Sequence, residues 1–141
     1  MTASATVGVV TTFDAAHRLW KYDGMCAFLH GHTYRAEVSV SGPVREDGMV
    51  VDFVVLKKAV VGSCAVLDHA TVLEHGDPLI MPLREAEQDV ILLAGPPTAE
   101  RIARWLLDDL RSDAPRRSWS AAHTLRVRVY ETPTSWAEVS G

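Results

Sequence analysis

Residues 33–41 read TYRAEVSVS, and this stretch decides the class of fold. Its apolar and polar residues alternate strictly: Tyr34, Ala36, Val38 and Val40 against Arg35, Glu37 and Ser39. Side chains two positions apart in a strand lie on the same face of a sheet. The stretch therefore predicts a half-buried antiparallel strand, with one face in a core and the other in solvent.

Working outward, residues 5–14 are rich in β-branched residues and predict a strand that continues toward His17. On the other side, Asp52 has the character of a helix N-cap. Apolar residues follow it at helical spacing: Phe53, Leu56, Ala59, Val60, Cys64 and Leu67. A helix is expected to begin directly after Asp52.

Further along, Thr98 is expected to cap a second helix over residues 99–110, AERIARWLLDDL. Residues 112–120, SDAPRRSWS, are expected to end that helix. Residues 124–131, TLRVRVYE, alternate and predict a closing strand.

The middle of the chain is less regular. Residues 68–79 are expected to be irregular, residues 89–95 to form a short apolar strand, and residues 49–51 to resume a strand briefly. The order of elements predicts an α+β fold in one domain, residues 1–141, with a four-stranded antiparallel sheet and two helices on one face.

Composition narrows the class of protein. The 141 residues carry a formal charge of −4, which argues against a nucleic-acid surface. We expect no membrane span, because Lys57 and Lys58 interrupt the longest apolar run. The start of the chain lacks the pattern of a signal peptide, so a cytoplasmic location is expected, with Cys26 and Cys64 as thiols.

Three histidines are candidates for metal ligands. His30 and His32 are two positions apart at the entry to a strand, so both imidazoles face the same side, and Gly31 between them leaves the approach open. His17 closes the preceding strand, which can pair antiparallel with the strand from Thr33. Three histidines without an evident fourth protein ligand indicate a catalytic zinc site with an open position.

Cys26, four residues before His30, has three interpretations that spacing alone does not rank. It is a small buried hydrophobe, a thiolate activated by the nearby cation, or a fourth zinc ligand in a closed structural site. Cys64, on the apolar side of the first helix, is expected to be a packing thiol.

Two further sites, the Asp68-His69 pair and Glu131, are candidates for catalysis or ligand binding. Asp68 and His69 place a carboxylate beside an imidazole, a pairing used to orient a general acid or base. Glu131 ends the last predicted strand, where ligand-binding groups are often presented. His75 and His123 are expected to be surface histidines.

The set as a whole resembles the family of 6-pyruvoyltetrahydropterin synthase and 6-carboxytetrahydropterin synthase. The matching segments cover nearly the full chain in family order: FDAAH (13–17), CAFLHGHTY (26–34), GMVVDFVVLK (48–57), LDHATVL (67–73), PTAE (97–100) and YETPTSWAEV (130–139). The cysteine followed by two histidines, with a third histidine upstream and Leu-Asp-His downstream, is specific to it.

The resemblance implies a role for each matching residue. His17, His30 and His32 would be the zinc ligands, and Cys26 would be the proton acceptor, held beside the zinc without binding it at rest. His69 with Asp68 would be the charge relay. Pterin-binding residues are expected at three positions, Thr98, Glu100 and Glu131, and Glu131 would also join the relay. Ala99 departs from the two consecutive threonines of the animal enzymes, and Trp20 stands where many members have proline.

The resemblance also implies an assembly: the tunnelling fold (T-fold), in which sheets of three subunits close into a barrel and two trimers stack as a hexamer, with active sites between subunits. The implied substrate is 7,8-dihydroneopterin triphosphate. The bacterial character of residues 131–139, ETPTSWAEV, and the cysteine spacing favour the carboxy branch. That branch yields 6-carboxytetrahydropterin, acetaldehyde and triphosphate on the route to queuosine and other 7-deazapurines.

Three alternatives stay open on the sequence. The first is 6-pyruvoyltetrahydropterin synthase, in which triphosphate leaves and the side-chain carbons stay. The second is a dihydroneopterin aldolase or epimerase, which shares the fold but uses no zinc. The third is a non-enzymatic binding module stabilised by zinc. Residues 74–95 are longer than in the shortest bacterial members, which affects the mouth of the pocket.

Overall fold

The computed structural model describes residues 3–112 and 118–141. The described strands are β1 (Ser4–His17), β2 (His30–Pro43), β3 (Ala70–Glu74), β4 (Val90–Leu93), β5 (Thr124–Thr132) and β6 (Ser135–Ser140). The helices are α1 (Phe53–Leu67), α2 (Ile80–Glu85) and α3 (Ala99–Ser112), with a short 3-10 turn, η1 (Met25–Ala27). The α+β class is confirmed. Residues 113–117, the larger part of the predicted helix-breaking segment, lie outside the described residues.

The sheet differs from the expected one in size and direction. Its described part has six strands in the order β4-β3-β1-β2-β5-β6, so the prediction of four strands was wrong. The prediction of a wholly antiparallel sheet was also wrong, because β3 is parallel to both β1 and β4. The two segments that were missed are short, and each follows turn-forming residues that concealed it: β3 comes after Asp68-His69, and β6 after the turn at Pro133.

Strands β1 and β2 form the long central ribbon and fix the position of the candidate site. They pair antiparallel over their full length, from Ser4 opposite Pro43 to His17 opposite His30. Because this register places His17 beside His30, and His32 lies on the same face two residues on, the predicted convergence of two neighbouring strands is confirmed.

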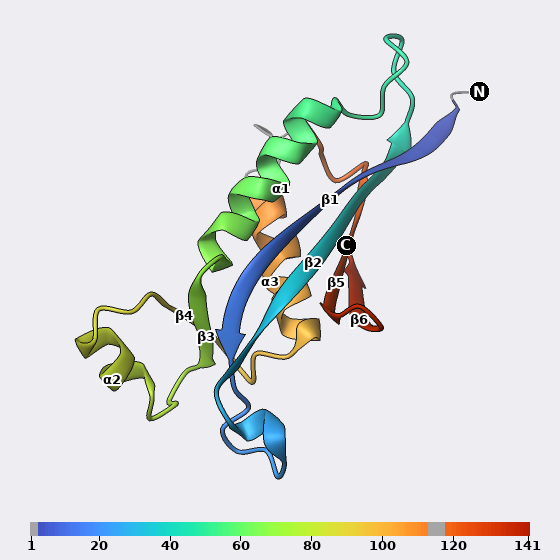
Figure 1. Cartoon of the computed structure of the whole chain (residues 1–141). Helices are drawn as coiled ribbons and strands as arrows, with labels where there is room; N and C mark the ends of the chain where they lie inside the picture. The colour runs from blue at the N-terminus through green and yellow to red at the C-terminus, as the bar shows by residue number, and fades with distance from the viewer. Residues whose placement is uncertain (1–2, 113–117) are drawn as a thin grey trace.

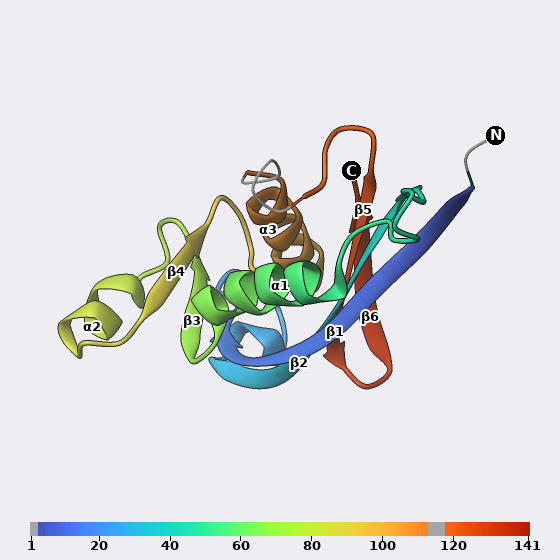
Figure 2. The same ribbon diagram turned by 90° about the horizontal axis from the view of Figure 1, so that it is seen from above.

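Helices α1 and α3 lie on one face of the curved sheet (Figures 1 and 2). Both begin at the predicted caps: Asp52 accepts a hydrogen bond from the Val54 amide (2.7 Å), and Thr98 Oγ1 accepts one from the Arg101 amide (3.3 Å). The core between helices and sheet contains fully buried residues of both layers, among them Tyr34, Val40, Leu56, Leu106, Leu110 and Val127. The two predicted helices on one face are confirmed.

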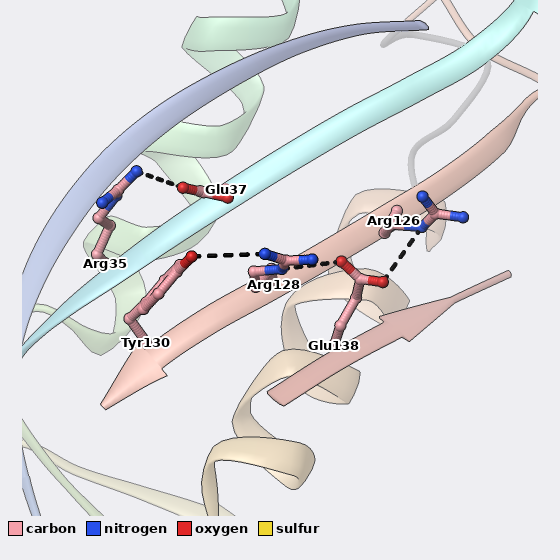
Figure 3. A network of polar contacts seen from close by, with 6 residues as sticks. All are labelled: Arg35, Glu37, Arg126, Arg128, Tyr130 and Glu138. Atoms are coloured by element: carbon pink, nitrogen blue, oxygen red, sulfur yellow. Dashed lines mark hydrogen bonds and ion pairs between the residues drawn. The ribbon is translucent and has the colours of Figure 1, made fainter. Parts of the chain in front are cut away.

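The opposite face of the sheet carries a polar network (Figure 3). Glu138 pairs with Arg126 (3.4 Å) and Arg128 (3.0 Å), and Arg128 lies over the Trp136 ring, 3.8 Å from its centroid. On β2, which neighbours β5, Arg35 pairs with Glu37 of the same strand. These are the polar positions of the alternating strands, so the sequence pattern correctly assigned the two faces.

Residues 70–85 are more ordered than expected, with β3 and α2 in succession, and β4 confirms the short strand expected over residues 89–95. Helix α2 projects beyond the β4 edge, away from the main body (Figures 1 and 2). Pro82 lies in its first turn, where a missing amide hydrogen breaks no helical bond. Residues 49–51 do not form a strand; Val50 and Val51 are buried (2% exposed) in the loop before α1. None of the described helices has the length and apolar character needed to span a membrane.

Candidate metal centre and the cavities beside it

Three imidazoles converge at one end of the central ribbon. His17 ends β1, and His30 and His32 open β2 on the same face. One ring nitrogen from each lies within 4.8 Å of the others, and no second such group of metal-ligating side chains exists in the described part of the chain. The ring centroids are 4.6 to 5.2 Å apart. This is the geometry expected of three ligands around one ion.

Backbone carbonyls fix the tautomers of two of these rings. His17 Nδ1 lies 2.8 Å from the Pro97 carbonyl oxygen, and His30 Nδ1 lies 2.6 Å from that of Phe28. A carbonyl only accepts, so each Nδ1 must donate a proton. In a neutral imidazole the other nitrogen then carries a lone pair, which is the usual arrangement of a metal-binding histidine.

This arrangement leaves three nitrogens that a cation would satisfy. His17 Nε2 and His30 Nε2 are 3.1 Å apart, so two lone pairs face each other without a proton between them. His32 Nε2 is buried and has no hydrogen-bond partner among the described residues. Tetrahedral zinc with bonds of about 2.0–2.1 Å separates its nitrogen ligands by about 3.3 Å. This separation is close to the 3.1 Å between His17 Nε2 and His30 Nε2. The residues present therefore fit zinc.

Burial keeps His17 and His32 available as neutral ligands. Desolvation lowers the pKa of His17, and this effect outweighs the hydrogen bond that His17 donates to the Pro97 carbonyl and the charge of Glu131, which both act to raise it. Burial likewise lowers the pKa of His32, although the Glu131 charge acts in the other direction. Glu131 Oε1 is 3.4 Å from His32 Nε2. The structure thus places Glu131 beside the histidine cluster, at the irregular end of β5 where the pairing with β6 shifts register.

Tyr34 is a residue near the site that the sequence indicated only as core. It is fully buried (0% exposed), stacks on Phe13 at 5.1 Å, and presents its ring to the edges of His17 and His32. Burial and the nearby Glu131 charge raise the pKa of Tyr34, so the phenol stays protonated. Its hydroxyl has no partner among the described residues. The only sequence signal for this position is its spacing of two residues from His32.

Asp68 and His69 form the predicted pair, and the pair is attached to β1. Asp68 Oδ2 lies 2.9 Å from His69 Nδ1, and Asp68 Oδ1 accepts the Asp14 amide at 2.8 Å. The Asp14 amide and His69 together lower the pKa of Asp68. His69 has a positive φ of 62° and donates its own amide to the Asp14 carbonyl. A left-handed conformation at a non-glycine residue is often found at functional sites.

Two cavities meet at His32 and Thr33. The first, of about 450 Å³, is lined by His32, Thr33 and His69 together with Asp14 and Thr71. The second, of about 510 Å³, adds Glu131, Arg35 and Tyr130 to the same two shared residues. Both volumes lie in the range of small-molecule pockets. His69 therefore shares the first cavity with His32, and Glu131 shares the second.

The other residues singled out in the sequence lie outside the histidine group and outside the two cavities that meet at His32. Thr98 lines a third cavity of about 410 Å³ with Leu19 and Tyr22, and Glu100 is exposed in the first turn of α3. Cys26 is half-buried in η1 and is not in the three-histidine group. Cys64 is buried in α1, where desolvation raises its pKa to about 12, as expected of a packing thiol.

Comparison with known proteins assigns the family. The family model described as 6-pyruvoyl tetrahydropterin synthase matches residues 6–141. The chain belongs to the 6-pyruvoyl tetrahydropterin synthase family. The resemblance inferred from the motifs is thereby confirmed.

Relatives within this family agree in sequence and in fold. The chain is 32% identical to 6-carboxy-5,6,7,8-tetrahydropterin synthase of Haemophilus influenzae, covering 90% of this chain and 92% of the relative. It is 33% identical to the protein of the same name from Rickettsia bellii, covering 90% and 94%. The solved 6-pyruvoyl tetrahydropterin synthase of Plasmodium falciparum superposes with a TM-score of 0.81 at 29% identity, covering 98% of each chain.

Proposed function

We propose that this protein is a zinc-dependent 6-carboxy-5,6,7,8-tetrahydropterin synthase that acts on 7,8-dihydroneopterin triphosphate. The observation that carries the proposal is the convergence of three imidazole nitrogens within 4.8 Å of one another at the end of the β1–β2 ribbon, beside the cavity lined by Glu131. The relatives of the carboxy branch support the choice of reaction.

His17, His30 and His32 would hold the zinc, which when bound polarises a substrate oxygen and makes the attached hydroxyl more acidic. Cys26 would accept the side-chain proton. Its half-buried position in η1, outside the ligand group, supports a proton acceptor over a fourth ligand. This also speaks against the zinc-stabilised binding module, which needs a closed site.

Asp68 would orient His69, and the imidazole would move protons at the substrate side chain. The contact of 2.9 Å between them and the bond from the Asp14 amide hold the ring in place. Glu131 would anchor the pterin ring, because a carboxylate accepts from the ring amide and the amino group together. Thr98 and Glu100 would complete the substrate pocket, although Thr98 borders a separate cavity in the described chain.

The second candidate is the pyruvoyl branch, and the likeness to the Plasmodium falciparum enzyme favours it. The two branches share the zinc, the base and the pterin anchor, so they differ in the fate of the side chain. In the carboxy branch the side chain breaks and acetaldehyde leaves. In the pyruvoyl branch only triphosphate leaves.

We also infer a homo-hexamer built from two trimers, in a cytoplasmic setting and on the route to a 7-deazapurine. Both sheet edges, β4 and β6, end without a further strand in the described chain. Trp136 on β6 is 50% exposed, so this edge presents a large apolar side chain. Light scattering of the purified protein tests the assembly.

The experiment for the function is incubation of the zinc-loaded protein with 7,8-dihydroneopterin triphosphate. The proposal predicts acetaldehyde and 6-carboxytetrahydropterin in equal amounts. Triphosphate release without acetaldehyde would assign the pyruvoyl branch. Release of neither product would contradict both readings.

A further inference from the structure

A buried ion pair joins the end of β1 to the segment before α2. Asp77 is 3% exposed and is the only buried carboxylate among the described residues. Arg18 donates to it twice, from Nε to Oδ2 at 2.9 Å and from a terminal nitrogen to Oδ1. Oδ1 also accepts the Leu79 amide at 2.8 Å. The carboxylate is therefore fully hydrogen-bonded, as a buried charge must be.

The residues that flank Arg18 connect it to the proposed site. His17, directly before it, is a candidate zinc ligand. Leu19, directly after it, donates its amide to the Cys26 carbonyl at 2.8 Å. One side chain thus anchors the backbone between a metal ligand and the residue that holds the cysteine loop.

The pair also joins two walls of one cavity. Leu19, Lys21 and Tyr22 line the 410 Å³ cavity from the loop after β1, and Glu74 lines it from the end of β3. Arg18 directly precedes Leu19 of the first wall, and Asp77 lies three residues beyond Glu74 of the second. The ion pair fixes the separation of these walls, since a bidentate contact tolerates little displacement.

We propose that Arg18 and Asp77 are positioning residues that set the placement of His17 and of Cys26 without contacting the substrate. This inference rests on the proposed function for its meaning, because it assigns those two residues to the reaction. The protonation states agree with it. Burial acts to raise the pKa of Asp77, but the bonds from Arg18 and Leu79 outweigh burial and lower it, so the carboxylate stays charged.

The test uses Asp77→Asn, which keeps the size of the side chain and an acceptor for Leu79 but removes the charge. The matched control is Asp108→Asn, because Asp108 pairs with Arg104 on the exposed side of α3 at 3.0 Å. Two readouts are taken on folded protein: the zinc dissociation constant, by competition with a chelator, and the rate at which iodoacetamide alkylates Cys26 in a Cys64→Ala background.

We expect Asp77→Asn to weaken zinc binding by about 10- to 100-fold, as outer-shell changes do, and to accelerate alkylation of Cys26, with the control unchanged. Unchanged zinc affinity and alkylation in folded Asp77→Asn would overturn the proposal. If Asp77→Asn does not fold, Arg18→Lys keeps the charge but loses the fork, and the same two readouts decide. Neither readout uses a pterin, so a failed substrate assay leaves this test intact.

Discussion

At the scale of single residues, the proposed metal ligands and the proposed proton acceptor are separate groups. His17 and His30 have their Nδ1 atoms held by backbone carbonyls, which directs their Nε2 atoms to a common point. Cys26 lies outside this group, half-buried in a short turn. The two functions can therefore be removed one at a time.

Replacement of Cys26 by alanine tests this separation. Cys26→Ala should lower kcat by about 10²- to 10⁴-fold, the usual contribution of a general base, while zinc content and fold stay unchanged. Steady-state kinetics and metal analysis measure the two effects. Cys64→Ala is the control and should stay active, because Cys64 is buried in the core. Loss of zinc together with activity in Cys26→Ala would indicate a closed four-ligand site.

Glu131 and His69 should differ in kinetic effect. Glu131→Gln should weaken pterin binding by about 10- to 100-fold, because an acceptor becomes a donor that faces a donor. His69→Ala should mainly lower kcat with substrate still bound. Titration of each variant with the dihydropterin, followed by turnover assays, distinguishes them. If Glu131→Gln bound the pterin as tightly as the parent, the pocket would have been placed wrongly.

At the scale of elements, the sequence predicted the long regular elements and the short apolar strand β4, and missed β3, α2 and β6. The strict alternation of residues 33–41 and the caps at Asp52 and Thr98 gave β2, α1 and α3 correctly. Strands β3 and β6 have five and six residues, too few for a periodic signal, and their place in the sheet depends on distant pairing. Parallel pairing of β3 with β1 has no local signature at all.

The cap of α1 offers a test of stability that leaves the site untouched. Asp52 Oδ1 accepts the Val54 amide at 2.7 Å, so Asp52→Ala should lower the free energy of unfolding by about 1 kcal/mol. Urea denaturation measures this change. Glu46→Ala, at an exposed position of the preceding turn, should have little effect. An Asp52→Ala variant as stable as the parent would show that the cap contributes nothing.

The ion pair between Arg18 and Asp77 links two elements and should respond to acid. The pKa of Asp77 is lowered in the folded chain, so folding holds this carboxylate charged below its ordinary pKa of about 3.9. Its stabilising contribution is present above that pH and is lost as the pH falls through the folded pKa. The gap in unfolding free energy between the parent and Asp77→Asn should therefore be constant above about pH 5 and shrink below about pH 4. A gap independent of pH would contradict this linkage.

At the scale of the whole molecule, the site is a product of the register between β1 and β2. The three histidines were recognisable in the sequence because His30 and His32 are two positions apart at the start of one strand, and His17 ends the neighbouring strand. The carbonyls of Phe28 and Pro97, which accept from His30 and His17, were not recognisable. Every residue has a backbone carbonyl, so the residue type does not indicate which one accepts. The same holds for Arg18 and Asp77, which are 59 residues apart in the chain.

Zinc content per chain is the decisive measurement, because the proposed function depends on a zinc ion bound by the three histidines. By elemental analysis, the purified parent should hold about one zinc per chain, as a three-histidine site requires. His30→Ala and His32→Ala should each lose most of it, while His75→Ala, at an exposed position outside the cluster, should retain it. Full zinc retention in both His30→Ala and His32→Ala would contradict the account.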